Sequence, residues 1–75
     1  MSKQVTLLLG QRLRSLRERK HLTQEQLADR ARMNVKHLQR LEGKTPSRAN
    51  IESLQNLADA FEMPLWKLLK FKESK

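Results

Sequence analysis

Five side chains between positions 34 and 40 have the chemistry needed to contact a nucleic acid. They are Asn34, Val35, Lys36, Gln39 and Arg40. On a helix, Lys36 and Arg40 would share one side, and Val35 and Gln39 would share the adjacent side. In the major groove of DNA, lysine and arginine pair with guanine, glutamine and asparagine pair with adenine, and valine meets a thymine methyl group. The pattern favours a helix face that reads base edges.

Each of these residues also has a plainer interpretation. Lys36 and Arg40 could form an ordinary solvated helix face, and Gln39 could be exposed without a role. Asn34 is also a good N-cap for a helix that starts at the next residue. The neighbouring His37 is expected to lie at the surface rather than to read a base.

The charge distribution favours a polyanionic partner. Residues 1–48 hold twelve lysines and arginines against four acids, whereas residues 49–75 hold four lysines and four acids. All eight arginines lie in the first of these segments, so the whole net charge of +8 is concentrated there. Nucleic acids and anionic membranes are the partners that such a surface attracts. A basic surface that serves only solubility is the simpler alternative.

Composition argues against several other classes of protein. The chain has no cysteine, which excludes disulfides and thiolate metal sites. No apolar run approaches the length of a membrane span, and the N-terminus does not resemble a secretory signal. No catalytic triad pattern, glycine-rich phosphate loop or metal-ligand cluster is recognisable, so we expect no enzyme, no cofactor and no metal.

The apolar spacing predicts a single all-α domain over residues 1–75. Five helices are expected, over residues 6–20, 24–32, 35–42 and 51–61, with a last short helix opened by residues 63–64. Thr23 and Gln26 have the spacing of a capping box, and Asn50 is the expected cap of the fourth helix. Ile51 and Leu69 are predicted to be buried with the other aliphatic residues. Leu65, Trp66 and Phe71 are apolar in excess of the core, and we expect them at a homodimer interface.

Three stretches of the chain resemble a known family. They are LGQRLRSLRERKH, the directly following LTQEQLADRARMNVKHLQRLEGK, and LADAFEMPLWKLL. The chain resembles the lambda-repressor-like Cro/C1-type (XRE) helix-turn-helix domains from about residue 9 to residue 69. The resemblance implies a five-helix fold with the helix-turn-helix at about 23–42. In that family the third helix reads the major groove, and the second lies across the DNA backbone.

The resemblance also assigns roles to individual positions. The residues expected to read bases are Asn34, Val35, Lys36, Gln39 and Arg40. The residues expected to bind phosphates are Thr23, Gln24, Lys44, Ser47 and Arg48. Arg17 and Glu42 match a pair that bridges the first and third helices. The chain departs from the family at His21 and Arg32, where glycine is usual. Non-glycine residues can adopt a positive φ at a modest cost, so these two turns and the tilt of the third helix could differ from the family pattern.

These features together predict a transcriptional regulator, a repressor or a controller protein, that binds a pseudo-palindromic operator as a dimer. The expected setting is the cytoplasm of a bacterium, with association to the nucleoid and with the gene carried by the bacterium or a phage. An exposed pair, Glu25 and Asp29, could contact RNA polymerase, although solubility is the simpler role. The alternative is an antitoxin that binds a toxin and autoregulates its operon. A peripheral membrane protein is the least favoured alternative.

Overall fold

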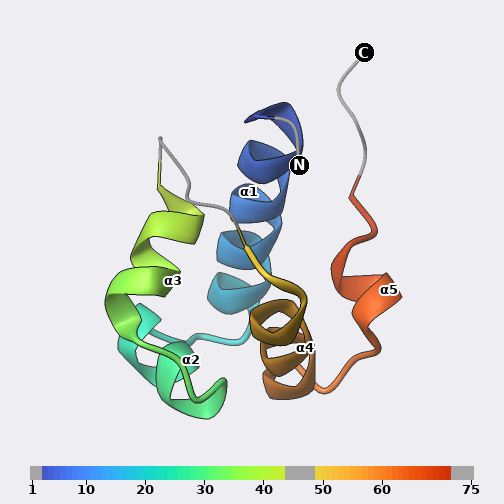
Figure 1. Cartoon of the computed structure of the whole chain (residues 1–75). Helices are drawn as coiled ribbons and strands as arrows, with labels where there is room; N and C mark the ends of the chain where they lie inside the picture. The colour runs from blue at the N-terminus through green and yellow to red at the C-terminus, as the bar shows by residue number, and fades with distance from the viewer. Residues whose placement is uncertain (1–2, 44–48, 72–75) are drawn as a thin grey trace.

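The computed structural model describes residues 3–43 and 49–71 and is all-helical over these residues (Figure 1). The five helices are α1 (Lys3–Arg19), α2 (Gln24–Arg30), α3 (Val35–Glu42), α4 (Ile51–Ala60) and α5 (Leu65–Leu68). The prediction of an all-α fold with five helices is confirmed. The first helix begins three residues earlier than predicted, and the second ends at Arg30 rather than near Arg32.

Side-chain caps explain where the middle helices begin. The Thr23 hydroxyl accepts a hydrogen bond from the Gln26 backbone N–H, and the Gln26 side chain accepts one from the Thr23 N–H. Asn34 caps α3 through the N–H of Lys36, and Asn50 caps α4 in the same way. Each cap satisfies a donor that the first turn of a helix leaves free. The predicted caps are therefore confirmed.

Three helices end in the same backbone motif. His21, Arg32 and Glu62 have φ values of 57°, 55° and 59°, which lie in the left-handed region. After each of them, the next backbone N–H returns to the preceding helix, as in the bond from Met33 N–H to the Ala28 carbonyl. This is the Schellman geometry, in which glycine is the usual left-handed residue. His21 and Arg32 therefore adopt the left-handed conformation although neither is glycine, and Glu62 is a third such residue.

Buried residues from all five helices form the hydrophobic core. In Figure 1, α2 and α3 lie to the left of α1. α5 lies to the right of α1, and α4 lies between α1 and α5. α1 packs most extensively against α3, and α4 packs against both α2 and α5. The fully buried large side chains are Leu9, Leu13, Leu27, Leu38, Leu41, Leu57, Phe61 and Leu68.

Two aliphatic residues predicted to be buried are exposed instead. Ile51 is 70% exposed and Leu69 is 36% exposed. Ile51 is the first residue of α4, and side chains on a helix tilt toward its N-terminus. Its side chain therefore projects past the end of the helix instead of onto the core. Leu69 follows the last residue of α5, where the helical face that buries Leu68 has ended.

Candidate nucleic-acid interface

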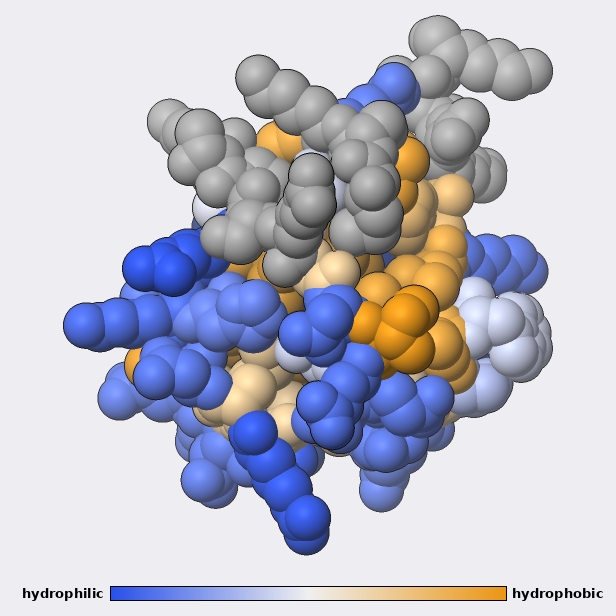
Figure 2. Space-filling model, in the orientation of Figure 1, coloured by the Kyte–Doolittle hydropathy of each residue, from blue (hydrophilic) through white to orange (hydrophobic). Residues whose placement is uncertain are grey.

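The outer face of α3 presents three long polar side chains to solvent. Lys36, Gln39 and Arg40 are exposed, and together with Gly43 they line a shallow groove along the helix. On the opposite face of the helix, Leu38 and Leu41 are buried. In Figure 2 the side of the molecule formed by α2 and α3 is largely hydrophilic. A helix with this exposure can enter a DNA groove without disturbing its own packing.

The other residues near the start of α3 are not equally free. The Asn34 side-chain oxygen accepts from the Lys36 N–H over 2.7 Å, so this residue acts as a helix cap. Val35 is half-buried and packs against the core, so only part of its side chain faces outward. His37 is also half-buried, and its Nε2 atom is enclosed without a hydrogen-bond partner among the described residues. The sequence placed His37 at the surface, and the structure corrects that expectation.

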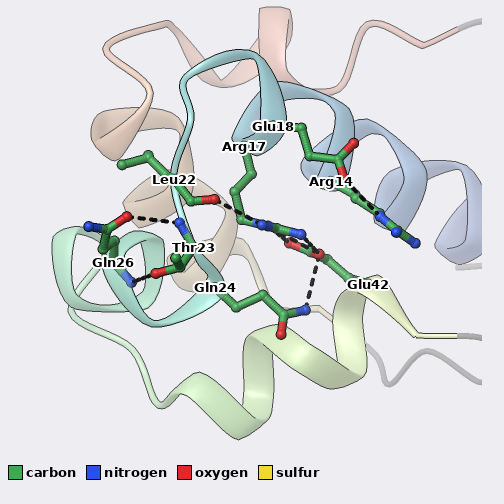
Figure 3. Close-up of polar contacts among 8 residues, drawn as sticks. All are labelled: Arg14, Arg17, Glu18, Leu22, Thr23, Gln24, Gln26 and Glu42. Carbon is green, nitrogen blue, oxygen red and sulfur yellow. Dashed lines mark hydrogen bonds and ion pairs between the residues drawn. The ribbon is translucent and has the colours of Figure 1, made fainter.

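A salt bridge joins α1 to the last residue of α3 (Figure 3). Arg17 Nε donates to Glu42 Oε2, and Arg17 Nη2 donates to Glu42 Oε1, each over 3.0 Å. The two side chains are only 13% and 3% exposed. A third nitrogen, Arg17 Nη1, donates to the Leu22 carbonyl over 2.9 Å. Arg17 thus connects α1 both to α3 and to the turn that precedes α2. These bonds restrain the direction of the exposed face of α3.

The hydrogen bond from Arg17 to Glu42 raises the pKa of Arg17 above its ordinary value, with a smaller contribution from the Glu42 charge. A group whose pKa is raised by folding stabilises the fold fully at any pH below its unfolded-state pKa. That contribution is lost only as the pH rises through the folded-state pKa. The Arg17 charge is therefore constant throughout the neutral range.

Gln24 extends this network toward the start of α2. Its side-chain Nε2 donates to Glu42 Oε1 over 3.2 Å (Figure 3). A primary amide has two N–H groups, so a second donor remains on the same nitrogen. Glu42 therefore holds Gln24 in place at the edge of the α3 face. The resemblance assigned Gln24 to a phosphate, but it did not assign this contact with Glu42.

Gly10 permits α1 and α3 to approach closely. A Cβ atom at this position would collide with the backbone carbonyl oxygen of Leu41 and lie 3.4 Å from the Glu42 Cα. Gly10 lies within α1 and its φ is not positive, so it serves proximity rather than backbone freedom. This role of Gly10 was not predicted from the sequence. The signal was the glycine itself, which is unfavourable inside a helix unless packing requires it.

Comparison with known protein families identifies the class of protein to which this exposed helix belongs. A family model described as a helix-turn-helix domain matches residues 8–65, which is most of the chain. The chain belongs to the helix-turn-helix domain family. No match was found in a comparison with curated proteins. Helix-turn-helix domains bind DNA through the second helix of the motif, and α3 has that place in this domain.

The residues expected to bind phosphates fall into two groups in this helix-turn-helix domain. Thr23 and Gln24 lie at the start of α2, and the Thr23 hydroxyl already accepts the capping bond from Gln26. Lys44, Ser47 and Arg48 lie outside the described residues. Of the first group, Gln24 lies beside the Arg17–Glu42 salt bridge, because its side chain donates to Glu42.

The helix-turn-helix domain also exposes apolar side chains away from α3. Trp66 is 65% exposed, whereas the other two predicted interface residues, Leu65 and Phe71, are half-buried against the core. With Ile51 and Leu69, Trp66 forms the set that we call the apolar surface (Ile51, Trp66 and Leu69). Figure 2 shows apolar atoms on the face formed by α4 and α5.

Other kinds of site find no support in the part of the domain that the structure describes. There, no three His, Cys, Asp or Glu side chains gather as potential metal ligands. Within residues 3–43 and 49–71, no helix has both the length and the apolar character needed to cross a bilayer.

Proposed function

We propose that this helix-turn-helix protein is a Cro/C1-type transcriptional regulator that binds a pseudo-palindromic operator as a homodimer and performs no catalysis. The observation that carries the proposal is the exposure of Lys36, Gln39 and Arg40 on a helix whose opposite face is buried. The Arg17–Glu42 salt bridge supports it, because a recognition helix must be held at a constant angle to read successive base pairs.

The three exposed side chains differ in what they can read. Arg40 can donate two parallel hydrogen bonds to guanine O6 and N7, which is the commonest specific contact in the major groove. Lys36 lies one helical turn away on the same side and can donate to guanine or to a phosphate. Gln39 suits adenine, because its amide both donates and accepts. These side chains supply the choice of sequence in the proposed complex.

Phosphate contacts supply most of the affinity and set the register of the protein on the duplex. Gln24 is suited to this role, because Glu42 holds one of its N–H groups and the other is available to an anion. A phosphate bound there would lie beside a side chain that is already hydrogen-bonded to α3. Binding to the backbone would therefore be coupled to the placement of the reading face.

Dimerisation is proposed through the apolar surface. Ile51, Trp66 and Leu69 lie at the start of α4 and at α5, and a large exposed tryptophan is typical of an interface anchor. The domain measures 33 × 23 × 22 Å. Two domains of this size are compatible with α3 helices about 34 Å apart, which is one turn of DNA.

The test compares the DNA affinities of Arg40→Ala and Arg19→Ala. The operator used is the site that footprinting identifies in the DNA upstream of the protein's own gene. Arg40 lies on the reading face, whereas Arg19 is an exposed arginine of α1 and serves as the matched control. Arg40→Ala should lower operator affinity by about 1–3 kcal/mol and leave affinity for random DNA nearly unchanged. Equal losses on both DNAs would make Arg40 a phosphate contact, and equal effects of the two variants would overturn the proposed reading face.

A further inference from the structure

Arg12 connects α1 to the far end of α5. Its Nη2 atom donates to the Lys67 carbonyl over 3.0 Å, and its Nε atom donates to the Leu68 carbonyl over 3.4 Å. These partners are 55 and 56 residues away in the sequence. The Arg12 side chain is half-buried, so it is not an ordinary solvated arginine.

α5 depends on such contacts because it is very short. It spans four residues, and its N-cap, Pro64, provides no side-chain hydrogen bond. Isolated helices of this length do not persist in water, and the last carbonyls of any helix lack partners within it. Leu68 is fully buried and anchors one face of α5. Arg12 supplies donors and a positive charge at the helix C-terminus, where both are favourable.

The two ends of this connection carry different parts of the proposed function. α5 and the residue after it carry Trp66 and Leu69 of the apolar surface. α1 holds the recognition helix through the close approach at Gly10 and the Arg17–Glu42 salt bridge. The Arg12 bonds therefore join the element that would meet the partner subunit to the element that orients α3.

The other described arginines of α1 do not make this connection. Arg17 is bound to Glu42 and the Leu22 carbonyl, and Arg14 pairs with Glu18 on the exposed side of α1. Arg19 is exposed. Among these four arginines, and within the described residues, Arg12 is the one that donates hydrogen bonds to α5.

We propose that Arg12 is a positioning residue that holds Trp66 and Leu69 of the apolar surface at a constant angle to α3 and thereby sets the half-site spacing that the dimer accepts. This inference rests on the dimeric DNA binding proposed above. A dimer reads two half-sites at one spacing only if each recognition helix is rigidly related to the interface. Loss of the Arg12 bonds would let α5 move relative to α1, and the dimer would then tolerate other spacings.

The first measurement follows α5 directly. Trp66 is the only tryptophan of the chain, so its fluorescence anisotropy and its quenching by acrylamide report on α5 alone. Arg12→Ala should lower the anisotropy and raise the quenching at dilute protein concentration, whereas Arg14→Ala should change neither. Arg12→Lys keeps one donor group and the charge and should be intermediate. If Arg12→Ala fails to fold by far-UV circular dichroism, Arg12→Lys is compared with Arg14→Lys.

The second measurement tests spacing. Operators with the natural half-site spacing and with one or two inserted base pairs are bound to each variant. The wild type should lose at least about tenfold in affinity for the altered operators, because a wrong register removes specific contacts from one half-site. Arg12→Ala should bind the natural operator several-fold more weakly and should discriminate between spacings by less than about threefold.

The outcomes separate this inference from the proposed function. Unchanged Trp66 signals in Arg12→Ala would overturn the positioning of α5 by Arg12. Altered Trp66 signals with full spacing discrimination would overturn the link between Arg12 and the operator. A wild type that binds half-sites as a monomer, with no preference for spacing, would overturn the dimer and with it the role in spacing. The Trp66 measurement would still decide whether Arg12 holds α5.

Discussion

Replacing Arg17 by methionine should be among the most destabilising single changes in this protein. Methionine preserves much of the apolar stem of the side chain but removes every donor. Three hydrogen bonds to Glu42 and one to the Leu22 carbonyl are lost. The Glu42 carboxylate, whose side chain is 3% exposed, would keep one hydrogen bond among the described residues, the bond from Gln24.

The magnitude follows from the burial of the pair. Removing one partner of a buried salt bridge costs about 3–5 kcal/mol, because the remaining charge is desolvated without compensation. A domain of 75 residues has a total stability of roughly 4–11 kcal/mol. Arg17→Met should therefore remove a large fraction of the stability and lower Tm by roughly 12–40 °C.

The matched control is the exposed pair Arg14–Glu18 on the same helix. Its side chains are 64% and 58% exposed, so Arg14→Ala should cost less than about 1 kcal/mol. Urea unfolding followed by circular dichroism measures both variants, and Trp66 fluorescence tests whether each transition is two-state. The double variant Arg17→Met/Glu42→Leu should regain most of the loss, since it leaves no unpaired charge. Similar costs for Arg17→Met and Arg14→Ala would refute the reasoning.

Three further predictions concern other parts of the molecule. Gly10→Ala should destabilise the fold by about 1–3 kcal/mol because the new methyl group collides with the Leu41 carbonyl; a cost no larger than that of Gly43→Ala in urea unfolding would contradict the close approach. Ile51→Ser should change stability by less than about 0.5 kcal/mol but weaken self-association in sedimentation; an unchanged dimerisation constant would remove Ile51 from the interface. Lys44→Ala should weaken binding to all DNA sequences alike and reduce the salt slope by about one; an unchanged slope would exclude a phosphate contact.

Short-range signals explain why the helices could be predicted. The Thr23–Gln26 capping box and the Asn34 cap involve residues two or three positions apart, and both occur as predicted. The left-handed turns at His21 and Arg32 are likewise local, because the backbone bonds that require them close within a few residues. The exposure of Lys36 and Arg40 follows from helical periodicity once Leu38 and Leu41 are assigned to the core.

Periodicity failed where burial depends on what covers a helix. Ile51 lies in phase with Leu54 and Ala58, yet it is exposed because α4 begins at that residue and no described element covers it. His37 shows the reverse error, since its imidazole is half-buried although its residue type suggested the surface. The spacing of residues along one helix indicates a face but cannot show how far the neighbouring helices extend over it.

The sequence by itself determined the helix caps, the basic first half of the chain and the donors on α3. The caps and the α3 donors depend on residue type and on spacings within about one helical turn, and the charge distribution depends on composition alone. The Arg17–Glu42 pair was expected from the family resemblance, but only the tertiary structure decided that Gly10 meets Leu41, that Arg12 reaches the end of α5 and that Gln24 joins Arg17 at Glu42. The hydrogen-bonded partners among these are 18 to 56 positions apart in the chain. They become neighbours only when hydrophobic packing brings the helices together, because nothing local holds such distant residues in contact.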